Sequence, residues 1–165
     1  NWVRRRLVRS IQVLVPGFIF INAVHPTAIL GKDVNLGYGI AIMPGVIVNA
    51  NSAIGDHCIL NTRSSVGHDG VLSDFSSLAP GVCCGGNLNL GTGAAISLGT
   101  LIIENISIGA WSVVGAGSLV LDGIRDNVVV YGSPARIIRK RRVGEPYLGI
   151  PRNRKDLKFP FTYTA

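Results

Sequence analysis

The chain is poor in charged, aromatic and sulfur-containing residues. Of its 165 residues, 15% are charged and 7% aromatic, and it has three cysteines and one methionine. The apolar runs are too short to span a bilayer, so we expect no insertion into a membrane. Cys58, Cys83 and Cys84 have neither the spacing of a zinc site nor that of a disulfide framework. We therefore expect no metal site and a reducing compartment, the cytoplasm.

Basic residues are scarce in the centre of the chain. The formal net charge is +7, yet residues 23–124 contain only Lys32 and Arg63 against six acids. The other basic residues lie near the two ends. This distribution suits a phosphorylated small ligand at one end better than a nucleic acid along the side, and no nucleic-acid-binding motif is present. We therefore expect no nucleic-acid partner.

What the chain does have is a six-residue repeat, which runs without a gap through residues 23–124. The second place is aliphatic in every hexad except the one with Cys84, and the sixth place is mostly small or β-branched. Period six is neither the period of a helix nor the alternation of a single strand. It fits a short strand and a corner, three of which close a triangular coil of about 18 residues. The sequence therefore predicts an all-β, parallel β-helix of a little under six coils.

The third place of the hexad is often glycine, as in Gly31, Gly55, Gly67 and Gly91. Glycine adopts backbone conformations that other residues avoid. We interpret these glycines as the source of the conformational freedom that each corner needs.

Three segments flank the predicted β-helix domain of residues 23–124. Residues 1–22 are predicted to form a lead-in helix and then a strand from Phe18, with the apolar residues of the helix on one face and its arginines on the other. Residues 125–142 are predicted to cap the open end with a strand and a short basic helix. Residues 143–165 form a C-terminal tail that either wraps a neighbouring subunit or stays mobile.

Three histidines are candidates for chemistry. His25 precedes Pro26 at the entry to the first coil, where a structural role is expected. His57 lies at a corner, where it is expected to be solvated or hydrogen-bonded between coils. His68 is followed by Asp69, and a positioned imidazole can accept a proton at neutral pH. From the residues alone, an exposed polar pair and a catalytic pair both remain open.

Residues 20–140 resemble the bacterial hexapeptide-repeat sugar acetyltransferases, which include the bacillosamine and perosamine N-acetyltransferases and the sialic acid O-acetyltransferases. The matching features are Ile42-Met43-Pro44, Asn49-Ala50-Asn51, Asn61-Thr62, His68 with the acid that follows it, Asp74-Phe75-Ser76, Gly86-Asn87 and Gly132-Ser133-Pro134-Ala135-Arg136. The resemblance implies a left-handed coil. It also implies direct acetyl transfer from acetyl-CoA to an amino or hydroxyl group of a sugar or nucleotide sugar.

The resemblance further implies a homotrimer with active sites between subunits. The first hexad place points outward, and apolar residues there would cover such an interface. These residues are Val71, Cys83, Leu101, Val113 and Leu119. Relatives also have an N-terminal sugar-binding domain, of which residues 1–22 resemble the last helix and the link.

Roles for single residues follow from the same resemblance. His68 takes the place of the general base and Asp69 that of the acid which raises its basicity, provided that the corner turns the carboxylate back. Asn61 takes a place near the substrate amine. The places that contact acetyl-CoA fall at Ser77, Gly86, Leu98, Ala116, Pro134 and Arg136, and the basic residues 139–142 extend toward its phosphates. Ser77 and Ala116 depart from the histidine and glycine that many relatives have there.

Two other functions remain open. A non-catalytic β-helix subunit of a larger assembly would need no base. A zinc carbonic anhydrase of the hexapeptide type would need three histidines around the metal, and the chain has no pair of histidines five residues apart.

Overall fold

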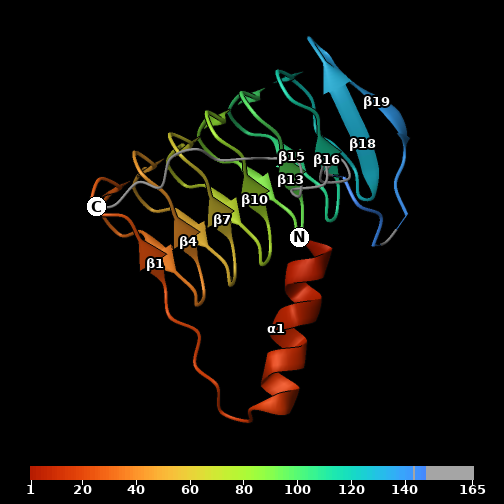
Figure 1. Ribbon diagram of the computed structural model, residues 1–165. Coiled ribbons are helices and arrows are strands. Elements are labelled where there is room, and N and C mark those ends of the chain that lie inside the picture. Colours follow the sequence, from red (N-terminus) through yellow and green to blue (C-terminus); the bar gives the residue numbers. More distant parts are fainter. Residues whose placement is uncertain (143, 148–165) are drawn as a thin grey trace, which may run out of the picture.

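The computed structural model describes residues 1–142 and 144–147, which form one helix beside a triangular prism of stacked coils (Figure 1). Helix α1 spans Trp2–Leu14. Across residues 23–124, every predicted hexad forms a two-residue strand at its first and second places. These strands are β1 (Ala23–Val24), β2 (Ile29–Leu30), β3 (Asn35–Leu36), β4 (Ala41–Ile42), β5 (Ile47–Val48), β6 (Ala53–Ile54), β7 (Ile59–Leu60), β8 (Ser65–Val66), β9 (Val71–Leu72), β10 (Ser77–Leu78), β11 (Cys83–Cys84), β12 (Asn89–Leu90), β13 (Ala95–Ile96), β14 (Leu101–Ile102), β15 (Ser107–Ile108), β16 (Val113–Val114) and β17 (Leu119–Val120).

Each of these strands pairs in parallel with the strand three hexads later, which makes one coil. Ala23 lies opposite Ala41, and Ile59 lies opposite Ser77. Within residues 1–142 the strands form sheets of eight, six and five members, and each sheet is one side of the prism. The result is a left-handed parallel β-helix, as predicted.

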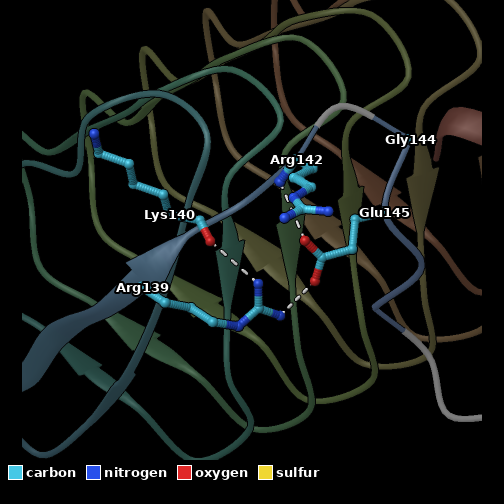
Figure 2. A pocket seen from close by; sticks show the side chains of 5 residues that line it. All are labelled: Arg139, Lys140, Arg142, Gly144 and Glu145. Carbon is cyan, nitrogen blue, oxygen red and sulfur yellow. Dashed lines mark hydrogen bonds and ion pairs between the residues drawn. The ribbon is translucent and has the colours of Figure 1, made fainter.

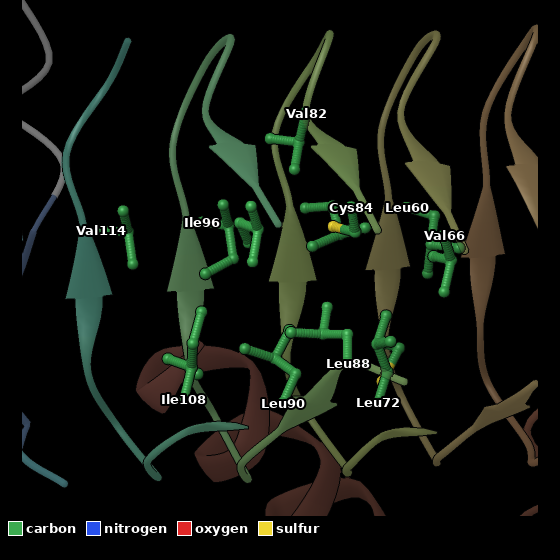
Figure 3. Packing of buried hydrophobic residues seen from close by; sticks show 14 of the residues in the cluster. Leu60, Val66, Leu72, Val82, Cys84, Leu88, Leu90, Ile96, Ile108 and Val114 are labelled. Carbon is green, nitrogen blue, oxygen red and sulfur yellow. The ribbon is translucent and has the colours of Figure 1, made fainter. Parts of the chain in front are cut away.

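The interior of the prism is filled by the second hexad place. Ile42, Leu60 and Leu90 are at most 1% exposed and belong to a continuous apolar core (Figure 3). Cys84 takes the same place, and burial raises the pKa of its thiol to about 12, so it behaves as a small hydrophobe. Val24 stays exposed because the first coil has a neighbouring coil on one side only.

The corners turn at the fifth hexad place. From Asp33 to Gly117, fifteen consecutive fifth-place residues have φ between 56 and 70°, in the left-handed region. The third-place glycines lie outside that region, so our interpretation of them as a source of conformational freedom is wrong. They are needed because neighbouring coils approach closely at this point. A methyl group on Gly91 would lie 2.5 Å from the backbone nitrogen of Ala110 and 2.8 Å from the carbonyl carbon of Gly109.

Beside three third-place glycines, Gly37, Gly55 and Gly109, the space holds an aspartate of the next coil. Asp56 Oδ1 accepts a hydrogen bond from the Tyr38 nitrogen (2.8 Å) and lies where a methyl group on Gly37 would be. Asp74 Oδ1 accepts one from the Asp56 nitrogen (2.8 Å) and lies in the same way beside Gly55. The glycine and the aspartate of the following coil therefore act together to satisfy a backbone N–H at the corner.

Helix α1 has the predicted extent but packs with a different face. Val8 is its buried residue, and Arg4 and Arg5 are half-buried beside it, whereas Val3 and Leu7 are more than half exposed. The prediction that the arginines lie away from the packed face is therefore wrong. The reason is that the prism offers partners for guanidinium groups: Arg4 Nη2 donates to the Phe75 carbonyl oxygen at 2.7 Å.

The link from α1 to the first coil is not a strand until Ala23, so the strand predicted from Phe18 is wrong over its first five residues. Phe18 and Phe20 instead pack edge to face, and Phe20 packs in the same manner on the ring of His57. His57 is buried and stacked on Phe75, and burial lowers the pKa of its imidazole. The prediction that His57 is solvated is wrong for its ring, which is buried against two aromatic rings. The predicted hydrogen bond between coils is made by its backbone, since the His57 nitrogen donates to the Tyr38 carbonyl oxygen at 2.7 Å.

Two strands cover the far end of the prism. β18 (Val128–Gly132) continues the eight-stranded sheet beside β16, and β19 (Ala135–Lys140) pairs antiparallel with β18. The basic helix predicted after Pro134 is therefore wrong. The outer edge of β18 would otherwise present unpaired backbone groups, which β19 satisfies. The tail predicted over 143–165 lies outside the described residues, except for 144–147.

Within the described residues, no helix has both the length and the apolar character needed to cross a lipid bilayer.

Candidate active site

The predicted site residues lie on two different corners of the prism. We name the corner between the eight- and six-stranded sheets the first corner, and the corner between the six- and five-stranded sheets the second corner. Asn61 and Leu98 follow strands β7 and β13 and lie on the first. His68 follows β8 and lies on the second. The six-stranded sheet separates these two groups within one chain.

His68 and Asp69 form a pair on the second corner. His68 Nδ1 lies 2.6 Å from Asp69 Oδ2, although adjacent residues of a strand point in opposite directions. The contact is possible because Asp69 holds the left-handed fifth place, with φ 56°, so the corner turns its carboxylate back as required. The hydrogen bond with His68, followed by one with Asn51, lowers the pKa of the Asp69 carboxyl. The carboxylate is therefore ionised at neutral pH and accepts a hydrogen bond from Nδ1–H.

Gly86 lies one coil beyond His68 on the same corner. An added Cβ at Gly86 would lie 2.6 Å from His68 Nε2 and 2.7 Å from Cε1, so the imidazole occupies the space that a side chain would fill. Gly86 was predicted to contact acetyl-CoA. The structure places it under the imidazole of His68 and away from the other predicted cofactor residues.

A cavity of about 530 Å³ opens beside the first corner. It brings together three of the predicted residues, Asn61, Ser77 and Leu98. Ser77 Oγ accepts a hydrogen bond from Asn1 Nδ2 at 2.9 Å, and Asn61 Oδ1 accepts one from the Thr62 nitrogen at 2.8 Å. The cavity wall is mostly apolar between these groups, which is typical of a small-molecule site.

Arg4 and Tyr147 also line this cavity, and neither residue was predicted from the sequence. Arg4 Nη2 is bound to backbone carbonyls, but its Nε is buried with no hydrogen-bond partner in the described part of the chain. Burial lowers the pKa of this guanidinium. The helical spacing of Arg4 and Val8 could have indicated that Arg4 faces the prism. Nothing in the sequence indicated Tyr147, because only the tertiary structure brings this residue to the cavity.

The remaining predicted cofactor residues extend along the same end of the prism. Ala116 is exposed on the first corner, one coil beyond Leu98. Pro134 is exposed in the turn between β18 and β19. Arg136, at the start of β19, is exposed, and its Nη1 lies 3.7 Å from Asp122 Oδ2.

The basic run, Arg136 and residues 139–142, does not form one cluster, because it lies on and just after strand β19 and not on a helix. Arg139, Lys140 and Arg142 line a separate pocket with Glu145 near the end of β19 (Figure 2). Arg139 forms an ion pair with Glu145 and holds the pKa of that carboxyl down at about 2. Arg141 is buried, and its guanidinium donates to backbone carbonyls, one of them at Trp111. Of the basic run, only Arg136 lies beside the turn that contains Pro134.

Residues 1–142 and 144–147 contain no group of three or more His, Cys, Asp or Glu side chains that could hold a metal ion.

No family model matches the chain, but comparison with known proteins finds relatives that include sugar N-acetyltransferases. Over 103 residues, 59% of the chain, it is 33% identical to GDP-perosamine N-acetyltransferase from Escherichia coli, of which it covers 46%. It is 38% identical to perosamine N-acetyltransferase from Caulobacter crescentus, solved as a histidine-to-asparagine variant with CoA and GDP-perosamine, with a TM-score of 0.79 over 82% of this chain and 63% of that one.

A third similar protein is the acetyltransferase domain of PglB from Neisseria gonorrhoeae, solved with acetyl coenzyme A. It is 29% identical, with a TM-score of 0.78 over 82% of this chain and 65% of that one. The chain thus spans about half the length of the curated relative and less than two thirds of each of these solved chains.

Proposed function

Because this β-helix is homologous to the hexapeptide-repeat sugar acetyltransferases, we propose that the chain transfers an acetyl group from acetyl-CoA to an amino or hydroxyl group of a nucleotide sugar. The observation that carries the proposal is the imidazole–carboxylate pair of His68 and Asp69 on an exposed corner. One relative, perosamine N-acetyltransferase from Caulobacter crescentus, was solved as two variants of a single histidine, which supports a role for a histidine in this chain.

The geometry of the pair suits a general base. Asp69 accepts a hydrogen bond from Nδ1–H, and in this tautomer the lone pair of the imidazole is on Nε2. The nitrogen or oxygen of the acceptor attacks the thioester carbonyl, the C–S bond breaks, and the proton of the acceptor passes to His68 Nε2. The protonated imidazole can then give this proton to the CoA thiolate. No covalent acetyl-enzyme is needed, because donor and acceptor are held together.

The cavity at the first corner is the proposed site of acetyl-CoA. Its apolar wall suits the pantetheine arm, and Asn61 and Ser77 offer hydrogen-bonding groups inside it. The exposed Arg136 is placed to meet a phosphate of the cofactor near the turn of β18 and β19.

We predict that titration with acetyl-CoA detects binding in this cavity and that Leu98→Glu weakens the binding at least about tenfold. Leu98 lines the cavity, and an added carboxylate there would be desolvated and would repel the phosphates of CoA. Leu14→Glu is the matched control, because Leu14 is also an exposed leucine but lies at the end of α1, outside the cavity.

Equal affinity of the two variants would place acetyl-CoA elsewhere. A wild-type protein that binds no acetyl-CoA, and releases no CoA thiol with GDP-perosamine as acceptor, would favour the non-catalytic assembly subunit.

A complete site requires two copies of the chain, since base and donor cavity lie on opposite edges of the six-stranded sheet. Within the described residues, the outer face of this sheet is apolar and uncovered, with Ile29, Cys83 and Leu101 exposed. Of the residues expected at the interface, Val113 is already buried within the chain, whereas Val71 and Leu101 are about half exposed. An apolar face of this kind supports the proposed homotrimer.

We predict a sedimentation mass of three 17.5 kDa chains at micromolar concentration. Leu101→Arg should lower this mass toward that of one chain, because it buries a charge without a partner at the interface. Leu101→Met keeps the side chain apolar and should remain trimeric. A monomeric wild type would contradict both the assembly and the shared site.

A further inference from the structure

The His68–Asp69 pair is contacted by the coil on each side of it. Asn51, one coil earlier on the second corner, donates from Nδ2 to Asp69 Oδ1 at 3.3 Å. Because Asp69 Oδ2 meets His68, the two oxygens of the carboxylate have different partners. The backbone of Asp69 is also tied to the earlier coil, since its nitrogen donates to the Ala50 carbonyl oxygen at 3.0 Å.

The later coil fixes the histidine. The nitrogen of Asn87 donates to the His68 carbonyl oxygen at 2.8 Å. The imidazole lies over Gly86, where an added methyl group would fall within 2.6 Å of Nε2. Gly86 is not among the residues in the left-handed region, so its backbone would accept alanine. Glycine is therefore required at residue 86 because the imidazole of His68 occupies the space that a side chain would fill.

We propose that Asn51 and Gly86 are positioning residues: Asn51 orients the Asp69 carboxylate toward His68, and Gly86 leaves the space in which the imidazole presents Nε2 to the acceptor. The proposal rests on the proposed function, because it matters only if His68 acts as the base.

The second corner also contains a residue, Asn105, with which Asn51 can be compared. Two coils along, Asn87 Nδ2 donates to Asn105 Oδ1 at 3.0 Å, so Asn105 belongs to the same kind of ladder without a carboxylate or a histidine in it. Asn51 and Asn105 both have φ 61°. Replacing either by glycine removes one ladder contact and adds no backbone strain. A purely structural ladder would respond equally to the two changes.

The experiment compares Asn51→Gly with Asn105→Gly, using acetyl-CoA and GDP-perosamine in the intact chain. We expect kcat to fall about 3- to 10-fold in Asn51→Gly only, from the loss of a hydrogen bond to a charged group, with the KM for acetyl-CoA unchanged in both. A second readout needs no acceptor. The carboxyl of Asp69, followed by NMR, should titrate at higher pH in Asn51→Gly, because a donor that lowers its pKa is lost.

The second comparison is Gly86→Ala with Gly123→Ala. An added Cβ at Gly123 would meet only the Ser107 carbonyl oxygen, at 3.6 Å, and that side chain would disturb nothing. Gly86→Ala should lower kcat about 10- to 100-fold by displacing the ring. It should leave the melting temperature close to that of Gly123→Ala, because the exposed imidazole can rotate away. In the His68→Ala background, Gly86→Ala should have no further effect.

Equal activities of the Asn51 and Asn105 variants and of the Gly86 and Gly123 variants, with His68→Ala inactive, would overturn this proposal alone. A His68→Ala enzyme at full speed would instead overturn the proposed function.

Discussion

Replacing His68 by alanine is expected to lower kcat about 10²- to 10⁴-fold, which is the usual contribution of a general base. The variant should keep its assembly and its affinity for acetyl-CoA, because His68 is exposed on the second corner and the donor cavity is at the first. The measurement is the release of CoA thiol with GDP-perosamine as acceptor. His25→Ala is the matched control, since His25 is also exposed and, within the described residues, its ring forms hydrogen bonds only with Thr27. His57 is unsuitable as a control because its ring is buried in an aromatic stack.

The dependence of the rate on pH provides a second test. Neutral imidazole is the active form of the base, so wild-type kcat/KM should fall toward acid pH as the imidazole becomes protonated. Asp69 stays ionised to lower pH than an ordinary aspartate, because its hydrogen bonds lower the pKa of its carboxyl. The Asp69 carboxylate is therefore protonated, and no longer an ionised partner of His68, only at lower pH. The His68→Ala variant should lack the acid limb, and a variant that keeps both its rate and this limb would remove His68 from the mechanism.

Gly91→Ala is expected to destabilise the fold by about 3 kcal/mol, the upper part of the range for overpacking. The added methyl group would lie within 2.5–2.9 Å of three backbone atoms of Gly109 and Ala110, which hydrogen bonds between coils hold in place. Gly81→Ala is the matched control, since Gly81 has φ 70° and nothing lies within 4 Å of an added Cβ. It should cost only about 1 kcal/mol of left-handed strain. The free energies of unfolding of the two variants are compared by urea denaturation at one protein concentration.

Which of the two variants loses more free energy of unfolding decides between two physical explanations of why glycine is needed in the coils. If Gly81→Ala destabilises more than Gly91→Ala, conformational freedom dominates at the corners. The opposite order supports close approach of neighbouring coils at the third hexad place.

The sequence by itself determined the coil. The six-residue period placed strands β1 to β17, and the aliphatic second place identified the core, because strand and corner repeat within one short unit and each unit meets its equivalent in the next coil. The sequence also identified His68 with Asp69, but not whether the two side chains meet. That contact depends on the left-handed conformation at Asp69, which appears only once the fifth place is seen to turn every corner.

The tertiary structure decided whatever depends on distant neighbours. Residues 135–140 contain good helix formers, yet the free edge of β18 pairs with them as a strand. Arg4 faces the prism because carbonyls of the Phe75 corner accept its hydrogen bonds across 71 positions of sequence. Asn61 and His68 are seven residues apart in the chain but fall on different corners, since one strand of the six-stranded sheet lies between them. The six-residue period determines which side chains are buried in the core of the coils. Hydrogen bonds and strand pairing between residues distant in the sequence determine which segments pack around the coils.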